Sequence, residues 1–291
     1  MQPVSATSSA ATGYLPNFII IGAQKCGTTA LHWYLREHPD ICMSSSKEPS
    51  FFCNSELWPN FSRGTDWYKS FFTRPAKAIG EASPEYTAYP YLTGIPERMH
   101  SLLPEAKLIY LVRDPIERII SQYVHNLYVI KEKRSLQTIL QDFENDYVYR
   151  SQYFRQISEF LRYYKMDQIL VLEQEALMQN RQQTLVEVFK FLGVSSEFDS
   201  PEFSKLHHMN ADRLGLNKIG RTISSLTPGK ELLGKYFPEV KQTARSLFRS
   251  AFNRRPPKMP ASLRAKLAKH LEPDIRQFRS LTGLKLENWS V

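Results

Sequence analysis

The residues best suited to chemistry form a short loop whose composition favours anions. Residues 22–29 read Gly-Ala-Gln-Lys-Cys-Gly-Thr-Thr and join an apolar run to a predicted helix. Glycine permits a tight turn, and the first turn of a helix presents unpaired N–H groups with a partial positive charge. Lys25 adds a full charge, and Thr28 and Thr29 add hydroxyl donors. The loop is therefore predicted to bind a phosphate group.

The loop differs from the Walker A loop of nucleotide phosphotransferases, in which lysine directly follows the second glycine. Here Thr28 follows Gly27, and Lys25 precedes that glycine by two positions. The lysine is therefore expected to approach the anion from the loop rather than from the helix. An ordinary strand-to-helix turn with a solvated lysine is the alternative interpretation. A P-loop phosphotransferase that uses ATP and magnesium is a more remote one.

A second candidate anion site follows the apolar run 107–112. Arg113 comes directly after this run, and Ser121 lies on the helix predicted next. An arginine fork suits a terminal phosphate because it can bind two oxygens at once. A structural pair of Arg113 with Asp114 or Glu117 is the alternative.

Alternating strands and helices must position these two loops. Apolar runs predict strands, and apolar residues at helical spacing predict helices between them. This alternation indicates an α/β fold with a mostly parallel sheet covered by helices on both faces, and ligands at the carboxyl ends of its strands. The predicted strands are 18–21, 107–112 and 169–172, and the predicted helices are 28–38, 116–130, 151–164, 184–192 and 261–282.

Length and composition limit the organisation of the chain. The 291 residues are 42% hydrophobic and 23% charged, typical of a globular protein. We expect a flexible leader over 1–16 and one domain over 17–291, with no apolar stretch long enough to span a bilayer. Lys and Arg exceed Asp and Glu by 38 to 29, a net charge of +9 that favours anionic partners. A polyanion-binding protein that uses the basic residues of 254–269 is therefore another alternative.

Residues 18–41, FIIIGAQKCGTTALHWYLREHPDI, resemble the phosphosulfate loop of sulfotransferases that use 3′-phosphoadenosine 5′-phosphosulfate (PAPS). The similarity is greatest to the heparan-sulfate and bacterial branch. The resemblance implies a three-layer P-loop-like fold, as in nucleoside triphosphate hydrolases. It also implies that Lys25 contacts the 5′-phosphate and the bridging oxygen. The residues implied to bind this phosphate with it are Cys26 (through its backbone), Gly27, Thr28 and Thr29.

Two further segments resemble the acceptor side of this family. KEPSFF, residues 47–52, is similar to a segment whose glutamate is the proposed catalytic base, here Glu48. GEASPEY, residues 80–86, is similar to a strand end in which Ala82 replaces the usual lysine, so Lys47 is a candidate substitute. Glu81, which lies in this strand end, is a further candidate for the base. His125 is another, because some branches of the family use histidine. Candidate acceptor contacts, from the family-like segments and neighbouring aromatic residues, are Trp67, Tyr68, Tyr128 and Tyr153.

The remaining nucleotide contacts also follow from the resemblance. Arg113 and Ser121 match the family's 3′-phosphate site. Lys218, Gly220 and Arg221 resemble a segment that closes over this phosphate, although Ile219 stands where the family usually has lysine.

The resemblance implies transfer of a sulfuryl group from PAPS, by in-line displacement and without a metal ion. The acceptor is expected to be a hydroxyl, amine or carbamoyl nitrogen of a small molecule, such as a bacterial secondary metabolite. A carbohydrate is the alternative acceptor. No nucleic-acid or membrane partner is expected. Three cysteines without a disulfide pattern favour a cytoplasmic enzyme.

Overall fold

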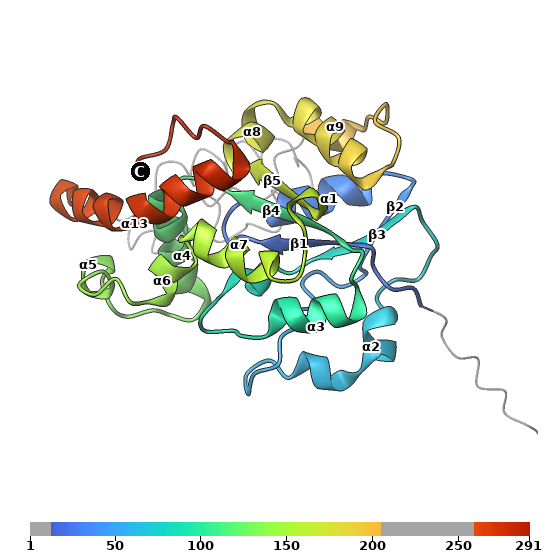
Figure 1. Ribbon diagram of the computed structural model, residues 1–291, viewed down its shortest axis with the longest axis horizontal. Helices are drawn as coiled ribbons and strands as arrows, with labels where there is room; N and C mark the ends of the chain where they lie inside the picture. The colour runs from blue at the N-terminus through green and yellow to red at the C-terminus, as the bar shows by residue number, and fades with distance from the viewer. Residues whose placement is uncertain (1–12, 205–258) are drawn as a thin grey trace, which may run out of the picture.

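A five-stranded parallel sheet forms the centre of the computed structural model, which describes residues 13–204 and 259–291. The strands follow the order β2-β3-β1-β4-β5, and every neighbouring pair is parallel. Figure 1 shows the sheet between layers of helices. The strand bounds are β1 (Phe18–Gly22), β2 (Ile41–Met43), β3 (Ala78–Ala82), β4 (Lys107–Val112) and β5 (Ile169–Glu173).

The helices connect the strands as the alternation of the sequence predicts. The described α-helices are α1 (Thr28–Arg36), α2 (Thr65–Lys69), α3 (Ile95–Leu102), α4 (Pro115–Val129), α5 (Leu136–Ile139), α6 (Asp146–Tyr149), α7 (Tyr153–Leu161), α8 (Gln174–Gln179), α9 (Arg181–Leu192) and α13 (Ala261–Thr282). Short 3₁₀ turns cover η1 (Asn60–Arg63), η2 (Pro84–Thr87), η3 (Met166–Gln168) and η4 (Pro201–Ser204). All five predicted helices are present, with ends that differ by a few residues.

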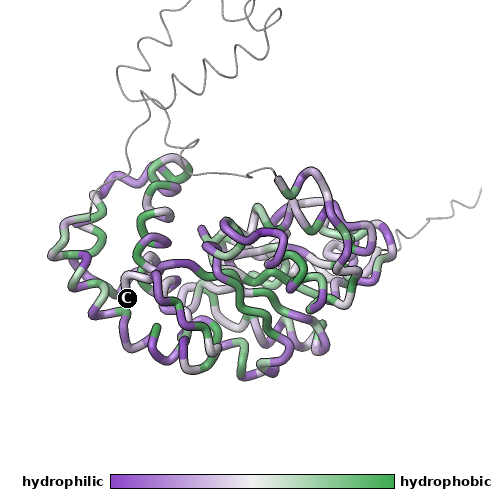
Figure 2. The backbone as a smooth tube through the Cα atoms, turned by 90° about the horizontal axis from the view of Figure 1, so that it is seen from above, coloured by the Kyte–Doolittle hydropathy of each residue, from purple (hydrophilic) through white to green (hydrophobic). Residues whose placement is uncertain are grey.

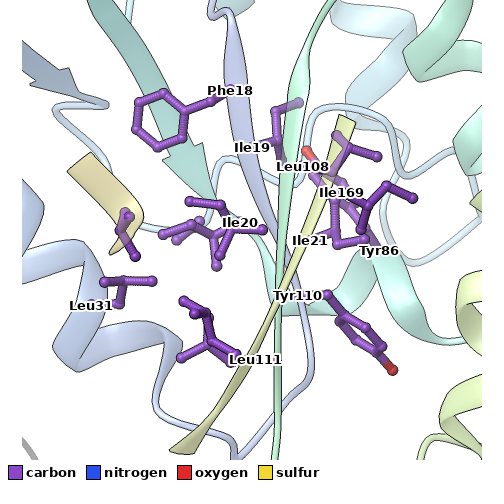
Figure 3. Packing of buried hydrophobic residues seen from close by; sticks show 14 of the residues in the cluster. Phe18, Ile19, Ile20, Ile21, Leu31, Tyr86, Leu108, Tyr110, Leu111 and Ile169 are labelled. Carbon is purple, nitrogen blue, oxygen red and sulfur yellow. The ribbon is translucent and has the colours of Figure 1, made fainter. Parts of the chain in front are cut away.

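Each face of the sheet packs against its own set of helices. In Figure 3, Ile20 and Leu111 lie on the side of Leu31 from α1, whereas Ile21 and Tyr110 lie on the opposite side. The ring of Tyr110 contacts Tyr153 of α7 and Phe278 of α13. Side chains of β1 and β4 therefore alternate between two helical layers, which explains why both strands are apolar apart from Lys107 at the start of β4. The three-layer α/β arrangement is confirmed.

Hydrophobic residues gather in the central strands, and hydrophilic residues lie around them (Figure 2). No helix in 13–204 or 259–291 is long and apolar enough to cross a membrane. The flexible leader expected over 1–16 extends too far toward β1. The Tyr14 amide donates to the Phe72 carbonyl at 3.1 Å, and Leu15 packs on the core.

Candidate active site

The β1–α1 loop lies at the carboxyl end of the central strand. Gly27 adopts φ 96° and precedes α1, and no side chain of the described residues caps this helix. Its first amides therefore face the loop, as an anion site requires. Lys25 also adopts a left-handed conformation, with φ 73°. Thr28 is buried at the start of α1 and Thr29 is half-buried.

Cys26 supports this loop from inside. Its side chain is fully buried, and its amide donates to the Ala23 carbonyl at 3.1 Å. Burial raises the pKa of its thiol to about 11, so the thiol stays protonated at neutral pH. The backbone of Cys26 shapes the turn, while its side chain packs against the Tyr153 hydroxyl, 3.7 Å from the sulfur.

The β4–α4 turn lies beside this loop because β1 and β4 are neighbours. The Ala23 amide donates to the Leu111 carbonyl at 2.7 Å. The Arg113 Nη1 donates to the Lys25 carbonyl at 3.4 Å, so the two predicted anion sites are in contact. The chain leaves β1 for β2 on one side of the sheet and reaches β4 on the other. Ligand sites of open parallel sheets form at such a switch point.

Arg113 does not form the structural pairs that were the alternative. Asp114 Oδ1 accepts from the amides of Ile116 and Glu117 at 2.9 Å and so caps α4. Glu117 pairs with Arg264 at 2.9 Å. The Arg113 Nε is buried and has no hydrogen-bond partner among the described residues. A buried guanidinium N–H normally has an acceptor, so this one fits an anionic ligand.

Arg118 contacts the predicted phosphate loop, although the sequence does not single it out. It is fully buried on α4, and burial lowers its pKa. Its guanidinium donates to the Gln24 carbonyl at 3.3 Å, and to Gln122, Ser151 and Tyr147. It therefore fixes the phosphate loop from behind. In the sequence Arg118 follows Glu117 and precedes Ile119 of a predicted helix, so no local pattern marks its burial.

Three candidates share one face of α4. Ser121, His125 and Tyr128 follow one another at helical spacing. Ser121 is buried, whereas His125 and Tyr128 are half-buried. These residues remain predicted contacts of the nucleotide or acceptor. Lys218, Gly220 and Arg221 lie outside the described residues.

Glu48 lies in the exposed loop that follows β2. Its side chain is 40% exposed and forms an ion pair with Lys47. The backbone of Glu48 is left-handed, with φ 58°, as is that of Ser50, with φ 49°. The Ser50 amide donates to Ser83 Oγ at 2.9 Å, and the Asn60 side chain donates to the Pro49 carbonyl at 3.0 Å. The loop therefore presents one carboxylate to solvent from a fixed backbone.

Glu81 occupies the opposite environment within β3. It is fully buried and accepts hydrogen bonds from Tyr68 at 3.2 Å, Ser83 at 2.5 Å and Tyr86 at 2.6 Å. Burial raises its pKa to about 7, although the three hydroxyls oppose this shift. Ser83 also accepts from the Ser50 amide, so Glu81 supports the Glu48 loop from below. Of these two carboxylates, Glu48 is the one exposed to solvent.

Two of the four residues predicted to contact the acceptor, Tyr68 and Tyr153, are buried in the core, so the prediction is wrong for them. Tyr68 is fully buried, stacks on Phe51 at 4.2 Å and donates to Glu81. Tyr153 is fully buried and donates to the Arg113 carbonyl at 2.8 Å. Both rings fill the core and offer no surface to an acceptor. Trp67 is half-buried, with the Arg63 guanidinium 4.0 Å above its ring.

Within 13–204 and 259–291, no group of His, Cys, Asp and Glu side chains has the arrangement of a metal site. The Lys25 backbone, Arg113 and the first turn of α1 lie together at the ends of β1 and β4. Glu48 lies on the loop after β2, which reaches the same edge of the sheet. The loops after β1 and β4 can bind an anion, and Glu48 is a candidate proton acceptor at the same edge.

Comparison with known proteins agrees with this site. A family model described as a sulfotransferase domain matches residues 15–219. The human bifunctional heparan sulfate N-deacetylase/N-sulfotransferase 2 is 32% identical over 197 residues, 62% of this chain and 22% of that protein. The membrane-associated sulfotransferase kil1 of Dictyostelium discoideum is 41% identical over 126 residues, 42% of this chain and 25% of that protein. The chain thus spans a quarter or less of these curated relatives.

A solved structure extends the similarity to nearly the whole chain. The sulfotransferase from Alicyclobacillus acidocaldarius has a TM-score of 0.66 and 25% identity, and the match covers 96% of this chain and 100% of that one. The family model alone matches more than half of the chain. By its fold, its phosphate loop and this match, the chain belongs to the sulfotransferase family.

Proposed function

We propose that the protein transfers a sulfuryl group from PAPS to an oxygen or nitrogen of an acceptor. The observation that carries this proposal is the contact between Arg113 and the Lys25 carbonyl, with the Arg113 Nε buried and unpaired among the described residues. Two anion-binding loops at neighbouring strand ends suit a donor with phosphate at both ends. A donor with one phosphate group would leave one of them empty.

Each loop has its own part in binding the donor. Lys25, the threonines and the α1 amides would hold the 5′-phosphosulfate, and Arg113 with Ser121 would hold the 3′-phosphate. Lys25 would also offset negative charge that builds on the 5′-phosphate oxygen as the bond to sulfur breaks. The predicted contacts of Lys218, Gly220 and Arg221 stay predictions.

Glu48 would act as the general base. It takes the proton from the acceptor as the acceptor atom forms its bond to sulfur and the bond from sulfur to the 5′-phosphate oxygen breaks. Its exposure lets an acceptor reach it, and its carboxylate forms an ion pair with the Lys47 ammonium. The metal independence of this transfer and a cytoplasmic location remain predictions.

The acceptor class is proposed with two candidates. The first is a small molecule with a hydroxyl, amine or carbamoyl nitrogen, such as a bacterial secondary metabolite. The second is a carbohydrate amine or hydroxyl, which the 32% identity to a heparan sulfate N-deacetylase/N-sulfotransferase favours. A panel of both classes with radiolabelled PAPS identifies the acceptor by the product that carries the label.

Calorimetry with adenosine 3′,5′-bisphosphate (PAP) tests the donor assignment. We expect tight binding that does not change when magnesium is chelated. Binding only with magnesium, or a preference for ATP, would support a phosphotransferase instead. A salt-dependent shift of DNA without affinity for PAP would support a polyanion-binding protein.

Arg113→Ala separates the two ends of the donor. The variant should lose affinity for PAP by roughly 10-fold or more, because a charge-assisted fork is lost. Its affinity for adenosine 5′-monophosphate, which has no 3′-phosphate, should change little. Equal losses for the two nucleotides would contradict the assignment of Arg113.

A further inference from the structure

The segment after α13, residues 283–291, folds back along this helix (Figure 1). Gly283 ends the helix with φ 71°. Arg279 then holds the returning segment, because its guanidinium donates to the carbonyls of Lys285 and Leu286 at 3.1 Å and of Val291 at 2.6 Å. The segment thus has a defined path, and this path leads to the nucleotide side of the sheet.

Ser290 contacts the residue that follows Arg113. Its amide and its hydroxyl both donate to Asp114 Oδ2, the hydroxyl at 2.6 Å. The other carboxylate oxygen, Oδ1, caps α4. One buried carboxylate therefore links three parts of the chain: the β4–α4 turn, helix α4 and the segment 283–291.

Trp289 contacts the residue that holds the Arg113 backbone. It is 7% exposed, and its ring lies 5.6 Å from the ring of Tyr153. The Tyr153 hydroxyl donates to the Arg113 carbonyl at 2.8 Å and accepts from the Arg113 amide at 3.4 Å. Both peptide groups of Arg113 are thus fixed by a side chain on which Trp289 packs.

Helix α13 fixes the same tyrosine from another direction. Asp274 accepts from the amides of Phe154 at 3.0 Å and Arg155 at 2.9 Å, at the first turn of α7. Tyr153 begins this helix, and its ring also lies 5.6 Å from that of Phe278. Tyr153 is therefore held by the 261–291 region on its backbone side and on its ring.

From these contacts we infer that Trp289 and Ser290 are positioning residues that hold Arg113 for the 3′-phosphate of the donor. The inference rests on the proposed function. Both residues lie outside the 15–219 match of the family model. The Arg113 guanidinium reaches the Lys25 carbonyl from a backbone that these contacts fix, so its direction depends on them. A guanidinium fork binds two phosphate oxygens only when its orientation is fixed.

The test measures preference for the 3′-phosphate rather than affinity alone. Calorimetry gives the dissociation constants of PAP and of adenosine 5′-monophosphate, and the constant for adenosine 5′-monophosphate divided by that for PAP reports the contribution of the 3′-phosphate. We expect the double variant Trp289→Ala/Ser290→Ala to lower this ratio roughly 10-fold, mostly through weaker binding of PAP. Glu287→Ala is the matched control, because Glu287 lies in the same segment with a side chain 75% exposed.

Single substitutions keep the test valid if the double variant does not fold. Ser290→Ala removes only the hydroxyl contact with Asp114 and should lower the ratio roughly 3-fold, while Trp289→Phe keeps a ring against Tyr153 and should preserve it. An unchanged ratio in Ser290→Ala and in the folded double variant would show that the segment only packs, and would overturn the inference alone. A wild-type protein without preference for PAP would overturn the proposed function, and the inference with it.

Discussion

Two carboxylates near the acceptor side differ in almost every physical respect. Glu48 is exposed and paired with Lys47, whereas Glu81 is buried and surrounded by hydroxyl donors. A base must meet the acceptor proton, which Glu48 can do from its place on the surface. Glu81 acts through Ser83 on the backbone of the same loop.

Glu48→Gln should lower kcat by roughly 10²–10⁴ and leave PAP affinity almost intact, since the amide cannot accept the proton. Steady-state kinetics and calorimetry on the same preparation check this. Glu56→Gln is a suitable control, because Glu56 is an exposed carboxylate in the neighbouring loop. Near-normal turnover in the Glu48 variant would remove its role as the base.

Lys25→Ala should reduce turnover by more than roughly 100-fold, because stabilisation of the leaving oxygen contributes about 3 kcal/mol. The measurement is kcat with saturating PAPS. Lys77→Ala controls for the loss of a positive charge, because Lys77 is 67% exposed and pairs only with Asp40 among the described residues. A Lys25 variant with wild-type kcat would contradict the mechanism.

Glu81 should make stability depend on pH. Its folded pKa of about 7 exceeds the ordinary glutamate value of 4.5, so between these pH values the folded state binds more protons than the unfolded chain. The free energy of unfolding therefore falls as pH rises through this window. Glu81→Gln lacks this dependence, so its stability relative to wild type should rise by about 3 kcal/mol between about pH 4.5 and about pH 7.5. Denaturant unfolding at both pH values measures the difference, and a constant difference would contradict the buried, protonated state.

The sequence predicts which residues form the candidate site better than it predicts which of them are buried. Glycine, lysine and threonine in order predict an anion loop, because each type has one obvious use. The burial of Glu81 has no such signal, because its hydroxyl partners come from positions 68, 83 and 86. The sequence predicts Tyr68 and Tyr153 as acceptor contacts because a tyrosine in the core and one on the surface give the same sequence signal.

At the scale of elements, the sequence predicts the strands whose residues are nearly all apolar, and burial alone does not separate them from the others, because β2 and β3 are also fully buried. Residues 18–21, 107–112 and 169–172 are continuous apolar runs, and β1, β4 and β5 cover them. Strand β2 has three residues, too few for a pattern. Strand β3 reads Ala-Ile-Gly-Glu-Ala, and the hydroxyl groups that bind its Glu81 come from residues outside the strand. Only the resemblance to a known strand end pointed to β3.

Close packing between β1 and η2 gives the element-scale prediction. A Cβ on Gly22 would lie 2.1 Å from Thr87 Oγ1, so Gly22→Ala should destabilise the fold by about 1–3 kcal/mol. Thermal unfolding measures the loss. In a Thr87→Ala background the same substitution should cost less, because the hydroxyl is gone, and equal costs in both backgrounds would show that the contact is not responsible.

At the scale of the whole molecule, the net charge of +9 should guide the donor to its site. PAP carries several negative charges, so its association should slow as salt screens the attraction. Stopped-flow measurements should show the association rate constant falling by roughly 10-fold between low and about 0.5 M salt. An uncharged acceptor analogue provides the comparison, and equal salt effects on both ligands would argue against electrostatic guidance.

The central place of β1 between β3 and β4 has a consequence for motion. Its amides can exchange with deuterium only when the sheet comes apart, while those of the outer strands β2 and β5 are released by smaller openings. A nucleotide bound at the carboxyl end of β1 therefore contacts the strand whose hydrogen bonds open last. Saturating PAP should raise the free energy of the opening that exposes the β1 amides by the full binding free energy, and so slow their deuterium uptake. The effect on the outer strands should be smaller.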